Sequence, residues 1–139
     1  MSSRVVIDTS VIFKWFVAYG ENGLDEAWSL LRDHQQGPVT LIAPALAAVE
    51  VTNLLRCSGI GADDARALLN DFELAHVVAF ETTPDRLQRA LSCAFENCIS
   101  VYDAIFLSLA QEFDCPLVTA DRRAFGTTPR TVADVQLIP

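Results

Sequence analysis

Residues 5–13 read VVIDTSVIF, and this stretch decides the fold of the chain. Three β-favouring residues lead into Asp8, two small hydroxyl residues follow, and an apolar run then resumes. The pattern predicts a buried strand that ends at Asp8, with a helix that begins at Thr9 or Ser10. Because burying a lone carboxylate is costly unless it is paired or binds a metal, Asp8 is the first candidate for a functional residue.

Short β-favouring runs and helical patterns alternate along the whole chain. Further strands are predicted at residues 39–43, 76–80, 116–119 and 135–138, and helices at 10–17, 24–36, 44–57, 63–75, 84–96, 103–113 and 121–125. The helix at 44–57 is apolar nearly all round, so we expect it to be central. The alternation predicts one α/β domain over residues 1–139, with a mainly parallel central sheet flanked by helices on both faces.

Composition narrows the class of protein. The chain has 139 residues, of which 51% are hydrophobic, and its net charge is -8. This charge argues against nucleic-acid binding through a basic surface, but a divalent metal can reverse the sign of an acidic pocket. No apolar run reaches the roughly 18 residues of a membrane span, and the N-terminus lacks a signal-peptide layout. We therefore expect a soluble, cytoplasmic protein without a membrane partner.

The cysteines suggest no zinc site. Cys57, Cys93, Cys98 and Cys115 form no CxxC pair, and neither histidine lies near one of them in sequence. We expect free and mostly buried thiols in a reducing compartment.

Four acidic residues stand apart from the charge-rich stretches: Asp8, Glu50, Asp103 and Asp121. Glu50 lies inside a predicted helix between apolar neighbours, where it cannot act as a cap, and we expect it to be buried. Asn53, one helical turn later, should lie on the same face and could orient the Glu50 carboxylate. Asp8, Asp103 and Asp121 each stand where a helix could begin, so for each of them alone a role as an N-cap is an equal alternative.

Taken together, these acids favour a metal site. In an open parallel sheet, ligands bind outside the C-terminal ends of the strands. Asp8 and Asp121 follow predicted strands, and helices that come after strands begin at the same edge, which suits Asp103. Carboxylates that converge there would repel one another unless a cation lay between them. Oxygen ligands without histidine or thiolate suit Mg²⁺ or Mn²⁺ rather than zinc.

The chain resembles the PIN-domain ribonucleases, and among them the VapC-type toxins of prokaryotic toxin–antitoxin pairs. The matching motifs are VIDTS at residues 6–10, Glu50 followed by Asn53, YDA at 102–104 and TADRRAF at 119–125. Size, motif order and α/β alternation agree over essentially the whole chain. The resemblance implies an endoribonuclease that hydrolyses RNA phosphodiesters with one or two Mg²⁺ ions, for which Mn²⁺ is a plausible substitute.

The resemblance also assigns roles and partners. Asp8, Glu50, Asp103 and Asp121 would be the catalytic residues and metal ligands. Ser10 and Thr119 would be supporting hydroxyls, with a turn or cap role as the alternative for each. A small cognate antitoxin protein would neutralise the enzyme, and we expect a homodimer.

Contacts to RNA are harder to assign. Lys14, Arg122 and Arg123 lie near the proposed site residues in sequence and could contact phosphates, although solvated surface charge is the better explanation for any one of them. The aromatic candidates for base stacking or a protein interface, with core packing as the alternative, are Trp15, Phe16 and Trp28.

Three other functions compete with the nuclease. A haloacid-dehalogenase-like phosphatase would have a second aspartate two residues after Asp8, where Ser10 stands. A phosphoacceptor receiver domain would have a lysine late in the chain, but Lys14 is the only lysine. The non-enzymatic alternative is a catalytically silent PIN-like module that binds RNA or a protein. The presence of all four acids argues against this alternative but leaves it open.

Overall fold

The computed structural model describes residues 2–17, 21–126 and 134–139. Its strands are β1 (Ser3–Ile7), β2 (Val39–Pro44), β3 (Val78–Phe80), β4 (Leu117–Thr119) and β5 (Val135–Leu137). They form one parallel sheet in the order β3-β2-β1-β4-β5. The central strand is β1, because Val6 pairs with Ile42 of β2 on one side and with Leu117 of β4 on the other. The prediction of a mainly parallel α/β sheet is confirmed.

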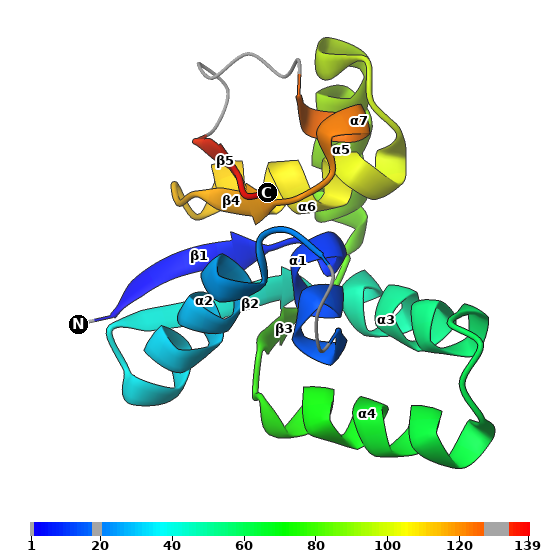
Figure 1. Ribbon diagram of the computed structural model, residues 1–139. Helices are drawn as coiled ribbons and strands as arrows, with labels where there is room; N and C mark the ends of the chain where they lie inside the picture. Colours follow the sequence, from blue (N-terminus) through cyan, green and yellow to red (C-terminus); the bar gives the residue numbers. More distant parts are fainter. Residues whose placement is uncertain (1, 18–20, 127–133) are drawn as a thin grey trace.

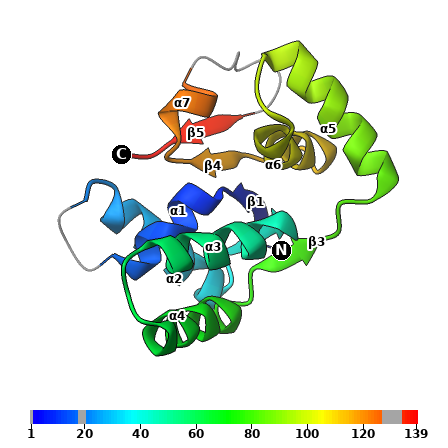
Figure 2. The same cartoon turned by 90° about the vertical axis from the view of Figure 1, so that its right-hand side faces the viewer.

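Helices cover both faces of the sheet (Figures 1 and 2). They are α1 (Thr9–Phe13), the 3-10 helix η1 (Lys14–Phe16), α2 (Leu24–Gln36), α3 (Leu46–Cys57), α4 (Ala62–Leu74), α5 (Pro84–Asn97), α6 (Val101–Glu112) and α7 (Arg122–Phe125). Helix α6 packs on β1, β2 and β4 and carries α5, whereas α2 packs on β2 and α1 packs on α3.

Helix α6 is more buried than α3. Six of the twelve residues of α6 are buried, because it lies between the sheet and α5. Helix α3 buries only the stripe Ala47, Val51 and Leu55, and Val49 is 65% exposed. The prediction that residues 44–57 form the central helix is therefore wrong. Apolar residues all round a helix permit burial on every side, but only the tertiary structure decides how many sides are covered. Pro44 also ends β2 instead of opening α3.

Among the described residues, no single helix is long and apolar enough to cross a membrane, and the one pair that passes by length and composition, α5 with α6, bends by 106° between the two helices.

One histidine joins three elements of the fold. His34, near the end of α2, accepts a hydrogen bond at Nδ1 from the backbone N–H of Leu41 (3.1 Å). Its Nε2 lies 2.9 Å from the carbonyl oxygen of Ala75 and 3.1 Å from that of His76. Because Nδ1 accepts, Nε2 must carry the hydrogen and donate. His34 therefore ties α2 to β2 and to the end of α4.

Replacing His34 by alanine should destabilise the protein by about 1–3 kcal/mol, because backbone groups of β2 and α4 lose their partner. Thermal unfolding measures the change. Gln35→Ala, at the exposed neighbouring position, is the matched control and should change stability by no more than about 0.5 kcal/mol. Equal melting temperatures for the two variants would contradict this role of His34.

Candidate functional site

The structure places the four isolated acids around one open cavity of about 800 Å³. Asp8 follows β1, Glu50 comes from α3, Asp103 lies in the first turn of α6, and Asp121 precedes α7. These elements meet at the C-terminal edge of the sheet, which faces the viewer in Figure 2. Residues up to 113 positions apart in the chain thus line one cavity because parallel strands end at the same edge.

Asp8 is held by two hydroxyl groups. Its Oδ2 atom accepts hydrogen bonds from Ser10 Oγ (2.6 Å) and Thr119 Oγ1 (2.8 Å). Those hydroxyls in turn accept the backbone N–H groups of Ala120 (3.0 Å) and Asp121 (3.0 Å), which directs their hydrogens toward Asp8. Both of these hydroxyls bind Oδ2, and among the described residues Oδ1 of Asp8 accepts no side-chain hydrogen bond.

Glu50 has a partner that the sequence did not reveal. Thr9 Oγ1 donates to Glu50 Oε1 at 2.9 Å, and Thr9 itself is buried. Asn53 lines the same cavity but makes no hydrogen bond with Glu50 among the described residues. The expectation that Asn53 orients Glu50 is therefore wrong. The side chain of Asn53 is exposed on α3, whereas the start of α1 brings Thr9 against the Glu50 carboxylate.

The capping alternative holds for one aspartate. Asp121 Oδ1 accepts the backbone N–H groups of Arg123 and Ala124, both at 3.1 Å, so Asp121 does cap α7. Asp103 is not the cap of α6, since Ser100 caps this helix through the N–H of Asp103 (3.1 Å). Asp8 precedes α1 without a side-chain cap bond.

Burial and the charges of neighbouring acids raise the pKa values of three of the four acids. Burial is the main cause that raises the pKa of Asp8, and the charge of Asp121 adds to it, against the hydrogen bonds from Ser10 and Thr119. Burial also raises the pKa of Glu50, with smaller contributions from the charges of Asp8 and Asp103. The pKa of Asp103 rises through burial and through the charges of Asp121 and Asp8. Three carboxylates therefore hold protons more strongly than free side chains do.

The three basic residues that were expected to contact RNA differ in exposure. Lys14 is buried and occupied, since its Nζ lies 2.6 Å from Glu21 Oε1 and 2.7 Å from the carbonyl oxygen of Asn22. Arg122 and Arg123 are exposed. Lys14 therefore holds the segment before α2 and is not available to RNA.

The aromatic residues also differ from expectation. Trp15 is buried and donates its indole N–H to the carbonyl oxygen of Ala27 at 2.9 Å, so it belongs to the core. Phe16 packs on the core, and Trp28 is 45% exposed on α2 and does not line the cavity. The exposed aromatic residue at the cavity is Tyr102, next to Asp103 in sequence and 66% exposed. Its position in the YDA motif was the signal that could have singled it out.

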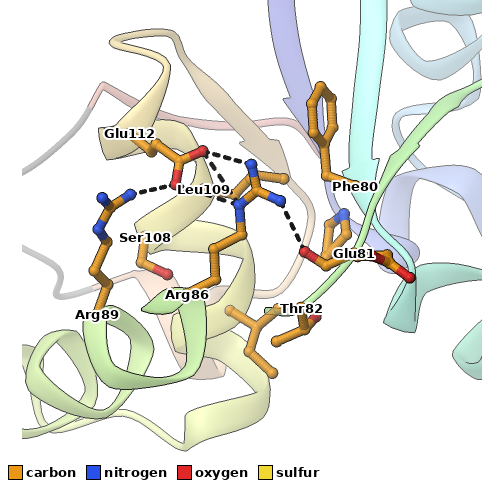
Figure 3. A pocket seen from close by; sticks show the side chains of 10 residues that line it. Phe80, Glu81, Thr82, Arg86, Arg89, Ser108, Leu109 and Glu112 are labelled. Carbon is orange, nitrogen blue, oxygen red and sulfur yellow. Dashed lines mark hydrogen bonds and ion pairs between the residues drawn. The ribbon is translucent and has the colours of Figure 1, made fainter. Parts of the chain in front are cut away.

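A second cavity, between α5, α6 and the end of β3, is structural (Figure 3). Glu112 accepts hydrogen bonds from Arg86, with Nη2 at 3.0 Å, and from Arg89. Arg86 also donates to the carbonyl oxygen of Glu81 at 2.9 Å and lies over the ring of Phe80. These polar groups satisfy one another, and the cavity of about 10 Å³ has room for at most one water molecule.

The chain belongs to the PIN-domain family, whose model matches residues 5–130. The predicted family is thus confirmed. No functionally curated protein matches the sequence. Among solved structures, VapBC2 of Rickettsia felis, bound to a promoter DNA fragment, is similar with a TM-score of 0.74 at 13% identity, over 98% of this chain and 99% of the other.

Two further structures show the same fold. PAE2754 of Pyrobaculum aerophilum has a TM-score of 0.70 at 20% identity, over 97% of this chain and 92% of the other. Mycobacterium tuberculosis VapC20, described as a Sarcin-Ricin loop cleaving toxin, has a TM-score of 0.66 at 20% identity, over 97% of this chain and 99% of the other. The structural relatives thus include toxins of toxin–antitoxin systems.

Proposed function

We propose that this protein is a Mg²⁺-dependent endoribonuclease and the toxin of a toxin–antitoxin pair, with Asp8, Glu50, Asp103 and Asp121 as its catalytic residues. One observation carries the proposal. Four acids that stand alone in the sequence, on four different elements, line one cavity at the edge of a parallel sheet. Nuclease activity is the common function that the PIN family suggests, and the similar VapC20 is described as a Sarcin-Ricin loop cleaving toxin.

The donor set fits magnesium. Among the described residues, no three His, Cys, Asp or Glu side chains lie close enough together to hold an ion by themselves. Mg²⁺ does not need such a cage, because it commonly binds through one or two carboxylates and keeps several waters. The oxygen-only donors favour a hard cation, and a cation would offset the repulsion between the charges of Asp8, Asp103 and Asp121. Mn²⁺ accepts the same ligands.

The acidic residues and the neighbouring hydroxyl residues would have different roles in the reaction. When bound, Mg²⁺ activates water and balances charge on the phosphate oxygens. Ser10 and Thr119 fix the Asp8 carboxylate, so that it enters the reaction already oriented. Thr9 does the same for Glu50. These hydroxyls act as positioning groups because they donate hydrogen bonds to the carboxylates.

RNA cleavage should require added Mg²⁺ or Mn²⁺. Purified protein is incubated with structured and unstructured RNA in each metal and in excess EDTA, and the fragments are separated by electrophoresis. Cleavage should stop in EDTA, return when Mg²⁺ exceeds the chelator, and respond poorly to Zn²⁺, since no imidazole or thiolate ligand is proposed. Full activity in EDTA would exclude this mechanism, and no cleavage with either metal would favour a catalytically silent PIN-like binding module.

Two protein partners belong to the proposal. A cognate antitoxin is supported by two similar structures, one described as a toxin–antitoxin complex from Klebsiella pneumoniae and the other as a member of the VapBC family of toxin–antitoxin systems from Mycobacterium tuberculosis. A homodimer is supported by an apolar stripe on the outer side of α5. Leu87, Leu91 and Phe95 follow one another at helical spacing and are 46%, 45% and 80% exposed. Such a contiguous apolar stripe is typical of a protein interface.

A further inference from the structure

We propose that a cavity next to the acidic one binds a nucleotide of the RNA substrate, adjacent to the phosphodiester that is cleaved. This inference rests on the proposed nuclease function. The cavity measures about 460 Å³ and lies between α7 and the turn that joins α5 to α6. Asp103 and Asp121 line both cavities. A chain of RNA whose phosphate lies at these two acids therefore has space on both sides of them.

The size of this neighbouring cavity, hereafter the flanking cavity, suits one nucleotide. Binding pockets for small molecules usually occupy about 300–1,000 Å³, and the flanking cavity lies within this range. Its wall is mixed, with polar side chains from Asn97 and Ser100 and the cationic side chain of Arg123. A nucleotide offers matching groups, namely an anionic phosphate, a ribose hydroxyl and the polar edge of a base.

Arg123 supplies a positive charge that is free to meet a phosphate. Among residues 2–17, 21–126 and 134–139 it takes part in no ion pair. Its backbone N–H donates to Asp121 Oδ1 at 3.1 Å, which fixes the residue beside the acid. An arginine fork suits the oxygens of a phosphate, and in a protein of net charge -8 such a cation stands out.

The turn between α5 and α6 supplies a hydrogen-bond acceptor. Asn97 donates its side-chain NH₂ to the carbonyl oxygen of Cys93 at 2.9 Å, which leaves its Oδ1 without a partner among the described residues. Cys98 then adopts a left-handed backbone conformation (φ 54°) that ends α5 and turns the chain toward Ser100. Asn97 Oδ1 can accept the 2′-hydroxyl of ribose or an amino group of a base.

The first test compares two neighbouring arginines. Arg123 lines the flanking cavity, whereas Arg122 is also exposed on α7 but lines neither cavity. Binding of a labelled short single-stranded RNA is measured by fluorescence anisotropy with Mg²⁺, in a Glu50→Gln background that keeps the RNA uncut. Arg123→Gln should weaken binding by about tenfold. It should also lower the slope of log Kd against log salt by about 0.7, the value for one lost phosphate contact on a single strand.

Arg122→Gln is the matched control and should retain both the affinity and the salt slope of the background protein. Equal losses in the two variants would overturn the proposal, because general surface charge would then explain them.

The second test uses a thiol already present in the flanking cavity. Cys98 is exposed and lines the cavity, while Cys57 is exposed at the end of α3 and lines neither cavity. Alkylation of both thiols is followed by mass spectrometry with and without RNA. RNA should slow the labelling of Cys98 and leave that of Cys57 unchanged, and Arg123→Gln should remove this protection. Equal labelling rates of Cys98 with and without RNA would overturn the subsite.

The two readouts separate this inference from the proposed function. RNA cleavage by the wild type without protection of Cys98 and without an effect of Arg123→Gln would leave the nuclease standing and remove the subsite. Protection of Cys98 without cleavage would keep an RNA-binding subsite and remove the nuclease.

Discussion

Replacing Glu50 by glutamine should reduce RNA cleavage by at least about a hundredfold while the protein stays folded. The amide keeps the size of the side chain, and its carbonyl oxygen can still accept the hydrogen bond from Thr9. The variant lacks only the negative charge that a metal ligand needs. Initial rates of RNA cleavage at saturating Mg²⁺ give the effect, and thermal unfolding checks that the fold remains intact.

Glu73→Gln is the control for this experiment. Glu73 is an exposed residue of α4 and lines neither the acidic nor the flanking cavity, so its neutralisation should leave cleavage near the wild-type rate. An equal loss in both variants would show that net charge, rather than the position of Glu50, controls the rate. An equal and undiminished rate in both would mean that Glu50 is not a ligand.

Replacing Asp103 by asparagine should leave the metal-free protein at least as stable as the wild type. Folding raises the pKa of the Asp103 carboxyl through burial and the charges of Asp121 and Asp8, so its ionised form costs stability at neutral pH. For an acid with a raised pKa in the folded state, this cost is complete above the folded pKa and disappears below the unfolded one. Asparagine removes the cost and can still accept the hydrogen bond from Ser100.

The same variant should respond less to metal. A ligand that binds only the folded state stabilises it by about 2.7 kcal/mol at a hundredfold excess over its Kd. We therefore expect Mg²⁺ to raise the melting temperature of the wild type clearly and that of Asp103→Asn much less. Melting curves in EDTA and in a series of Mg²⁺ concentrations measure both effects without RNA or a partner.

Asp85→Asn is the matched control, because Asp85 also lies in the first turn of a helix but is exposed and lines neither cavity. It should keep the full response to Mg²⁺. If Mg²⁺ stabilised Asp103→Asn as much as the wild type, Asp103 would not be a ligand.

The alternation of patterns predicted the sheet and most of the helices. Strands that are buried on both faces need continuous apolar runs, and VVI before Asp8 and LV before Thr119 are such runs. The isolated acids could also be recognised in the sequence, because a lone charge among apolar residues is costly to bury unless it is paired or binds a metal. Both signals are local in sequence, so a sequence alone carries them.

Only the tertiary structure decided which side chains meet. Thr9 reaches Glu50 across 41 positions of the chain, and Thr119 reaches Asp8 across 111. Which of the neighbouring hydroxyls finds which carboxylate depends on the strand order and on the angle at which α1 leaves the sheet. The periodicity of the sequence specifies neither the strand order nor this angle. For the same reason Asn53 appeared to be the partner of Glu50, Lys14 appeared free for RNA, and α3 appeared central. Asn53 and Lys14 have the side-chain chemistry for the roles expected of them, and α3 has the apolar residues of a central helix. The surroundings of all three, however, are formed by segments far away in the sequence.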